Sequence, residues 1–185
     1  MLGPFTRRRV LVALGGLGVF VAAGLRACVP SLASTKPDEL RTLTADEYRL
    51  FSKLVPLVLP TAGSRLTPTD EIPVLKNLDE AFGGIDPKLR DDLGKGLMLF
   101  DLGAVVLGGS LTRFVNLDET AALAYCEKWQ SGSSVQRAIF NAIKQFVCVS
   151  YWRDPRTWGP VEYDGPVSDK NNLPRLGNAP MPEET

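Results

Sequence analysis

Four pairs of adjacent acids are the residues of this chain whose types and spacing could do chemistry. They are Asp46-Glu47, Asp70-Glu71, Asp91-Asp92 and Asp118-Glu119. Two neighbouring carboxylates can act as a general acid and a general base. Most of these pairs, however, come at predicted helix starts, where a negative charge offsets the helix macrodipole. We therefore interpret them as helix caps rather than as catalytic groups.

The 185-residue chain contains no histidine. This absence argues against Ser-His-Asp hydrolysis, Cys-His proteolysis, a zinc-hydrolase site and the usual proximal haem ligand. There is also no Cys-x-x-Cys pair and no c-type haem signature. We predict no catalytic, cofactor-binding or metal-binding residue on this chain, and we expect any electron transfer to take place on another protein.

Three cysteines are present, at positions 28, 126 and 148. If Cys126 and Cys148 lie on antiparallel helices joined near residue 132, they are about six and sixteen residues from the turn. At about 1.5 Å per residue the mismatch is about 15 Å, whereas a disulfide needs Cα atoms within about 7 Å. We therefore predict either two buried thiols or a disulfide from Cys126 or Cys148 to another subunit.

The N-terminal 33 residues have the layout of an export signal. Arginines at positions 7–9 precede an apolar run at residues 10–25, which is shorter than the ~20 residues of a membrane-spanning helix. Pro30 and the small residues around Ala33 follow, and we expect cleavage after Ala33. The stretch TRRRVL at residues 6–11 resembles the twin-arginine export motif, with Arg7 and Arg8 as the paired arginines. Twin-arginine export carries folded proteins, often with a partner attached.

Two other interpretations of this N-terminus stay open. One is an ordinary secretory signal that happens to contain three arginines. The other is a lipoprotein signal at LRAC, residues 25–28, in which Cys28 would be acylated, although Arg26 fits that pattern poorly. An uncleaved or lipidated N-terminus would tie the protein to the inner membrane. Otherwise we expect a periplasmic protein that reaches a membrane only through its partners.

The charge of the chain is distributed unevenly. Lysines and arginines equal aspartates and glutamates at 21 each, but four arginines and no acids lie in the first 33 residues. The remainder is therefore acidic by about four charges. Nucleic-acid binding needs clustered Lys and Arg, so we expect no nucleic-acid partner.

Helical signals after the export signal predict one all-α domain. Residues 34–43 are polar and indicate a linker, and Thr44 with Glu47 forms a capping box. Capping residues, prolines, glycines and helical apolar spacing predict five helices. Their expected ranges are 44–59, 73–82, 86–108, 118–131 and 133–150. We predict a bundle of about five helices at residues 44–150, followed by an irregular, extended C-terminal arm at residues 151–185.

The arm has a composition unlike that of the bundle. It contains six prolines and lacks helical periodicity, and two Trp and two Tyr occur within its first thirteen residues. Such a segment cannot form a core of its own. Its aromatic side chains must be covered by the bundle or by a second protein.

The arm also carries a family resemblance. The stretch YWRDPRTWGPVEYDGP at residues 151–166 resembles the end of the small subunits in the gluconate 2-dehydrogenase subunit 3 family. In that family an aromatic pair, Asp-Pro and a later Tyr-Asp-Gly-Pro follow the last helix. The region from Leu50-Phe51 to Pro60, the stretch Ile72-Pro73-Val74, and residues 100–114 run parallel to the same pattern. The resemblance thus covers nearly the whole chain.

The resemblance implies an accessory role rather than catalysis. Such a chain is the non-catalytic partner of a large FAD-containing dehydrogenase of the glucose-methanol-choline type, and a multihaem cytochrome c is often the third member. The FAD and any haem c then belong to the other subunits. The small subunit carries the export signal and supports folding and stability of the catalytic subunit, which oxidises an alcohol or a sugar.

We expect the arm to form the interface with this large subunit. The residues predicted for it are Tyr151, Trp152, Asp154, Pro155, Trp158 and Tyr163. Two alternatives stay open. The arm of a stand-alone periplasmic scaffold or binding protein could close over a small ligand, and Tyr163 or Asp164 could act directly in an enzyme.

Overall fold

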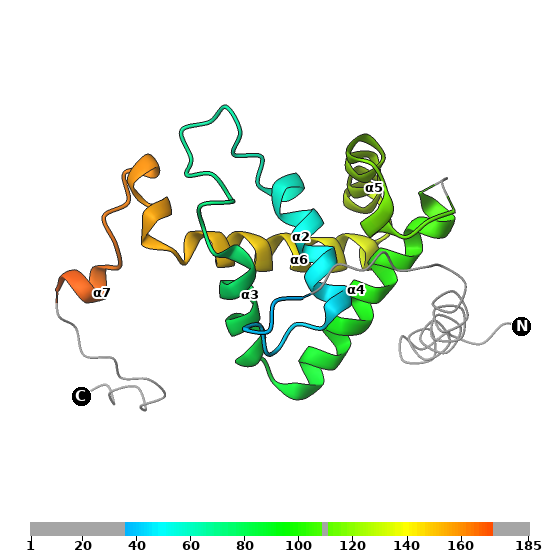
Figure 1. Ribbon diagram of the computed structural model, residues 1–185, viewed down its shortest axis with the longest axis horizontal. Helices are drawn as coiled ribbons and strands as arrows, with labels where there is room; N and C mark the ends of the chain where they lie inside the picture. Colours follow the sequence, from blue (N-terminus) through cyan, green and yellow to red (C-terminus); the bar gives the residue numbers. More distant parts are fainter. Residues whose placement is uncertain (1–35, 109–110, 172–185) are drawn as a thin grey trace, which may run out of the picture.

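The computed structural model describes residues 36–108 and 111–171, and these ranges are helical without a strand (Figure 1). The α-helices are α2 (Ala45–Val58), α3 (Val74–Gly83), α4 (Pro87–Leu107), α5 (Glu119–Ser131), α6 (Ser134–Trp152) and the short α7 (Val167–Lys170). Three 3₁₀ turns are η1 (Phe114–Asn116), η2 (Pro155–Thr157) and η3 (Gly159–Val161). The predicted all-α class and the five main helices are confirmed.

Side-chain caps set the starts of the helices. Thr44 and Glu47 form the predicted capping box of α2, and Ser133 forms a second one at α6. Asp86 caps α4 and Asp118 caps α5 through bonds to backbone N–H groups. These bonds satisfy donors that have no partner within the helix. The short-range sequence signals therefore give the helix starts to within a residue or two.

Helix α6 lies at the centre of the bundle and contacts α2, α3, α4 and α5 (Figure 1). Its buried residues share one helical face, as their spacing requires. Phe140, Ile143, Val147 and Tyr151 are among them. α6 thus supplies the apolar surface onto which the shorter helices pack.

An aromatic cluster joins α4, α5 and α6. The ring of Phe100 has edge contacts with Phe114, Tyr125 and Trp129 at centroid distances of 4.8, 5.2 and 4.9 Å. It also stacks on Phe140 at 5.8 Å. The Tyr125 hydroxyl donates a hydrogen bond of 2.7 Å to the Phe100 carbonyl oxygen. Offset and edge contacts of this kind stabilise a core beyond the effect of buried area.

The described part of the expected linker at residues 34–43 is bound to the bundle. Leu40 and Leu43 are buried. The Asp79 carboxylate on α3 accepts hydrogen bonds from the backbone N–H groups of residues 41, 42 and 43, at 3.0, 2.8 and 2.7 Å. Burial raises the pKa of Asp79, but these three bonds outweigh it and hold the pKa below its ordinary value. The polar composition of the segment therefore gave the wrong expectation, because its backbone is held by an acid 36 residues or more away.

The C-terminal segment also differs from the expected extended arm. α6 continues to Trp152, and η2 and η3 follow directly. The segment is joined to the loop between α2 and α3: the Tyr151 hydroxyl donates to the Thr67 carbonyl oxygen at 2.6 Å, and Arg156 Nη1 donates to the Glu71 carbonyl oxygen at 2.9 Å. Thr67 Oγ1 in turn donates to the Arg156 carbonyl oxygen at 2.9 Å. Residues 151–158 are thus part of the folded domain.

Candidate functional site

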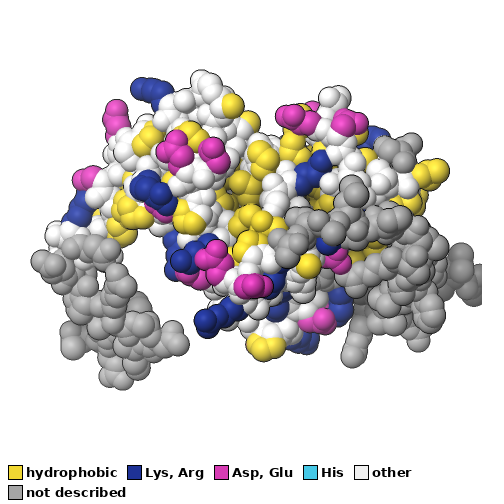
Figure 2. All heavy atoms as spheres, in the orientation of Figure 1, with side chains coloured by type: hydrophobic (Ala, Val, Ile, Leu, Met, Phe, Trp, Pro, Cys, Tyr) yellow, Lys and Arg dark blue, Asp and Glu magenta, His cyan; other side chains and the backbone are white. Residues whose placement is uncertain are grey.

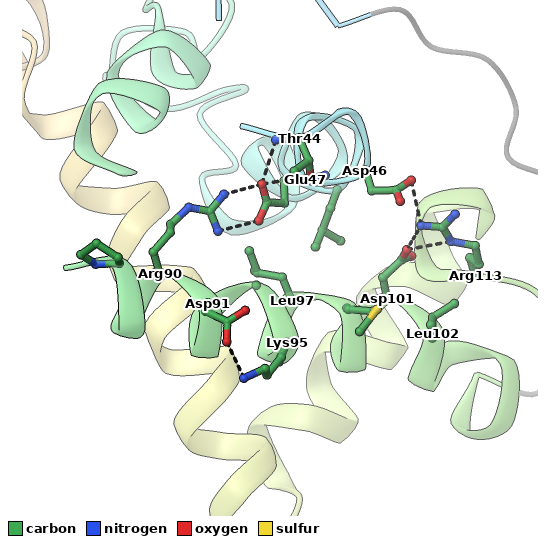
Figure 3. Close-up of a pocket in the computed structure, with 14 residues that line it drawn as sticks. Thr44, Asp46, Glu47, Arg90, Asp91, Lys95, Leu97, Asp101, Leu102 and Arg113 are labelled. Carbon is green, nitrogen blue, oxygen red and sulfur yellow. Dashed lines mark hydrogen bonds and ion pairs between the residues drawn. The ribbon is translucent and has the colours of Figure 1, made fainter. Parts of the chain in front are cut away.

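A partly open cavity of about 410 Å³ lies between α2 and α4. Its volume falls in the range of small-molecule sites. We call it the α2–α4 groove. It is lined by Thr44, Asp46, Glu47, Leu50, Pro87, Arg90, Asp91, Gly94, Lys95, Leu97, Met98, Asp101, Leu102 and Arg113 (Figure 3). The groove thus combines apolar residues with seven ionisable side chains.

One end of the groove is closed by a bidentate ion pair between the two helices. Arg90 on α4 donates from Nη1 to Glu47 Oε1 at 2.8 Å and from Nη2 to Oε2 at 2.6 Å (Figure 3). The Thr44 backbone N–H also donates to Glu47 Oε2, at 2.9 Å. Burial raises the pKa of Glu47, but the bonds from Arg90 and Thr44 outweigh it and the pKa lies below its ordinary value. Glu47 therefore caps α2 and fixes α4 at the same time.

The other end holds a buried acid–base pair. Arg113 donates from Nε to Asp101 Oδ2 at 2.8 Å, and Nη2 binds the same oxygen. The Val115 backbone N–H donates to Asp101 Oδ1 at 3.2 Å. Both carboxylate oxygens accept hydrogen bonds, an arrangement that suits the ionised form. Arg113, which directly precedes η1, also donates from Nη2 to Asp46 Oδ1 at 3.2 Å (Figure 3). It thus joins Asp101 of α4 to the start of α2.

Burial has opposite effects on the two partners of this pair. It raises the pKa of Asp101, and the charge of Arg113 only partly offsets this rise. Burial lowers the pKa of Arg113, but the charges of Asp101 and Asp46 outweigh it, so the guanidinium pKa is raised. The guanidinium thus stays charged, and it compensates a carboxylate that would be costly to bury alone.

The outer rim of the groove is charged and exposed. Lys95 Nζ lies 2.5 Å from Asp91 and 3.2 Å from Asp92 on the same helix. Hydrogen bonds to these two acids raise the pKa of Lys95. Exposed pairs of this kind contribute little stability. They do place two carboxylates and an ammonium group beside the groove.

The most buried acids of the groove, Glu47 and Asp101, are held by Arg90 and Arg113. Within residues 36–108 and 111–171, no group of three His, Cys, Asp or Glu side chains is placed to hold a metal ion. Among the helices of these ranges, none has both the length and the apolar character needed to cross a bilayer. Figure 2 shows acidic and basic side chains interspersed with apolar ones on one face of the molecule.

Two of the acid pairs differ from the capping role that we predicted. Asp46 and Glu47 lie in the first turn of α2, and both also bind arginines of distant segments. Asp91 and Asp92 lie in the second turn of α4 rather than at its cap. Sequence reasoning missed Arg90, Asp101 and Arg113. The sequence did offer one signal of a buried acid: Asp101 lies among the apolar positions of a helix face, between Phe100 and Ala104.

The predicted interface residues fall into three environments. Tyr151 is fully buried in the core of its own chain, so its ring is not available to a partner. Trp152 packs partly against the same core and makes an edge contact of 5.0 Å with Tyr151. Asp154 caps η2 and pairs with Arg156 at 2.7 Å, while Pro155 is exposed at the first position of this turn.

Trp158 and Tyr163 form the outer part of the segment. Trp158 is half-buried, and its Nε1 donates to the Trp152 carbonyl oxygen at 2.8 Å. Its ring meets Tyr163 edge-on at 5.2 Å, and Tyr163 is 46% exposed. Gly165 has φ +104° under the Trp158 ring, a conformation that other residues adopt only with strain. The Asp-Gly-Pro of the sequence motif thus supports Trp158.

Cys126 and Cys148 are not joined to each other. Cys126 on α5 is buried, and burial raises its pKa to about 11. Cys148 on α6 is half-buried, and burial raises its pKa as well. Both thiols are therefore poor nucleophiles at neutral pH. Arg7, Arg8 and Cys28 lie outside the described residues.

Comparison of the chain with protein-family models, with curated proteins and with solved structures gives no match.

Proposed function

We propose that this chain is the non-catalytic small subunit of a periplasmic FAD-dependent dehydrogenase of the glucose-methanol-choline type. It would accompany the catalytic subunit through twin-arginine export and support its folding and stability. The substrate, an alcohol or a sugar, and the FAD would bind to the partner. A multihaem cytochrome c would be the third member of such a complex.

The observation that carries the proposal is the aromatic surface at residues 158–167. Tyr163, Val161 and Val167 are exposed there, and Tyr163 rests against the ring of Trp158. This surface stands on a rigid base, because the preceding residues are hydrogen-bonded to the loop between α2 and α3. A preorganised surface loses little entropy on docking, and Tyr and Trp are frequent hot-spot residues.

The partner interface can be tested by substitution of Tyr163. Tyr163→Ala should weaken association with a co-expressed flavoprotein subunit by about 2 kcal/mol, the usual hot-spot threshold. The melting temperature of the isolated chain should fall only slightly, because Tyr163 is 46% exposed and its ring contact is the edge-on one with Trp158. Leu89→Ala on α4 removes another exposed apolar side chain and is the matched control. Unchanged association of Tyr163→Ala, measured by pull-down and by surface plasmon resonance, would contradict the proposed interface.

For Trp152 and Trp158, both association and stability must be measured, because both side chains pack partly on their own chain. The docking hypothesis predicts that replacement of either by Ala weakens association even at temperatures where the variant is still fully folded. A purely internal role predicts a large fall in melting temperature with association intact. Circular dichroism melts beside pull-down assays separate the two.

Export and cysteine bridging are tested separately. Replacement of Arg7 and Arg8 by Lys should leave the precursor and its partner in the cytoplasm, and arrival of the mature protein in the periplasm would refute the twin-arginine interpretation. For a disulfide to the large subunit we favour Cys148 over the buried Cys126. Non-reducing electrophoresis of the complex should show a band at the summed mass that Cys148→Ser removes.

A second candidate function follows from the α2–α4 groove. A stand-alone binding protein would use this cavity for a small polar ligand. Scanning calorimetry of the isolated chain with a panel of monosaccharides would show a concentration-dependent rise in melting temperature for a binder. The small-subunit proposal expects no such rise.

A further inference from the structure

The α2–α4 groove continues as an apolar track along α4. Its floor is formed by Leu50 of α2 and by Leu97, Met98 and Leu102 of α4. Leu99 and Val106 are 46% and 74% exposed on α4. With Leu102 they have i, i+3 and i+7 spacing, so the three side chains share one stripe. Leu102 is only 4% exposed, so Leu99 and Val106 provide the open apolar surface of this stripe. From Gly94 to Val106 this track is about 18 Å long, at 1.5 Å per residue.

The chain itself contains a segment that fits this track. Residues 10–25 are an uninterrupted apolar run with glycines, and they lie outside the described residues. As a helix, this run would be about 24 Å long. It is tethered to the groove, because the described chain begins at Lys36 and Thr44 already lines the groove. The ten residues at 26–35 span up to about 35 Å when extended, and such a tether favours docking within one chain.

Charge adds a second argument for the same occupant. The apolar run is flanked by arginines at positions 7–9 and by Arg26. At the start of the track, Asp91 and Asp92 share the single ammonium group of Lys95, which leaves one net negative charge there. At the other end, the Asp46 carboxylate is paired with Arg113 and Arg49. A basic apolar segment thus meets an apolar track whose start carries a net negative charge.

We propose that residues 10–25 of the unprocessed chain dock in cis along the α2–α4 groove and the adjoining α4 stripe. The folded domain then covers part of its own export signal until that signal is displaced. The groove has room for the apolar side chains of one helical turn, and the open stripe takes the remainder. The docking does not depend on the proposed function, whereas its consequence for export does.

The test uses the full chain with a photoreactive residue in the apolar run. Phe20 is replaced by p-benzoylphenylalanine, which keeps an aromatic ring at that position. Irradiation of the dilute protein, followed by mass spectrometry of its peptides, should give an adduct within one chain. We expect the attached peptides to come from α2 or α4, between residues 44–50 or 91–106.

A groove-filling variant makes the test specific. A Cβ added at Gly94 would lie 3.5 Å from Arg90 Nη1 and 3.7 Å from Glu47 Oε1, which is ordinary contact. Gly94→Leu therefore fills the groove, and it also removes a residue unfavourable in helices. Lys88→Leu places the same side chain at an exposed position of α4 outside the groove and is the control.

The outcomes separate this inference from the proposed function. We expect Gly94→Leu to lower the adduct at least five-fold and Lys88→Leu to leave it unchanged, with both variants folded by circular dichroism. An adduct that persists in Gly94→Leu, maps to other helices or joins two chains overturns the docking in cis. Since no flavoprotein is present, such a result leaves the subunit proposal standing, and that proposal is tested by Tyr163→Ala.

Discussion

Replacement of Asp79 by Asn should release the segment before α2 from the bundle. Two backbone N–H groups, of residues 42 and 43, bind Asp79 Oδ1, and the N–H of residue 41 binds Oδ2. An amide keeps one acceptor oxygen, but its NH₂ group would face a backbone donor. Hydrogen bonds to a charged group contribute about 1.5 to 3 kcal/mol each. Loss of one bond and of the charge in the other two predicts a destabilisation of about 2 to 4 kcal/mol.

The pH dependence gives this prediction a second readout. Because the folded-state pKa of Asp79 is lowered, its stabilising effect is fully present above the unfolded-state value of about 3.8. The effect is lost as the pH falls from there through the folded-state pKa. The difference in unfolding free energy between wild type and Asp79→Asn should therefore be constant from pH 7 to pH 5. It should shrink only below about pH 4.

Urea unfolding of the full chain, followed by circular dichroism, measures both effects. With a slope of about 1 to 3 kcal/mol per M, a loss of about 2 to 4 kcal/mol should lower the midpoint at pH 7 by about 0.7 M or more. Asp92→Asn is the control, because its exposed pair with Lys95 contributes at most about 1 kcal/mol. A midpoint of Asp79→Asn within the range of the control, or a difference that does not shrink in acid, would refute the reasoning.

Three further predictions concern the core and the thiols. Gly103→Ala should lower stability by about 1 to 3 kcal/mol, although Ala has the better helix propensity. The reason is that the added Cβ would lie 2.8 Å from a tyrosine hydroxyl that is hydrogen-bonded in the core. An unchanged melting temperature would contradict this prediction. Asp101→Asn should cost about 3 to 5 kcal/mol by leaving Arg113 without its buried counter-charge, and a double-mutant cycle with Arg113→Met should show strong coupling in urea unfolding. In the native protein, Cys148 should react with iodoacetamide faster than Cys126, and equal rates would argue against the burial of Cys126.

Local rules account for most of what the sequence predicted correctly. The capping box at Thr44 and the caps at Asp86 and Asp118 each involve residues two or three positions apart. Such signals depend on backbone donors of a single helix turn. The starts of these helices could therefore be found before any packing was known.

The expected extended arm shows where local reasoning fails. Aromatic and proline composition correctly marked residues 151–166 as distinct, but composition does not say what covers an aromatic ring. Tyr151 continues the apolar face of α6 by helical spacing, and its hydroxyl finds a carbonyl 84 residues away. The end of the helix and the beginning of the exposed surface are thus decided by tertiary contacts.

The sequence by itself determined the helical class, the helix starts, the absence of histidine chemistry and an N-terminal stretch with the features of an export signal. Each of these depends on residue types or on spacing within a few positions. Only the tertiary structure decided that Asp79 holds the segment before α2, that Glu47 meets Arg90, and that Asp101 is buried with Arg113. These partners are 12 to 43 positions apart. Their meeting follows from the packing of the helices on α6, because the low polarity between packed helices makes each buried charge require a specific partner.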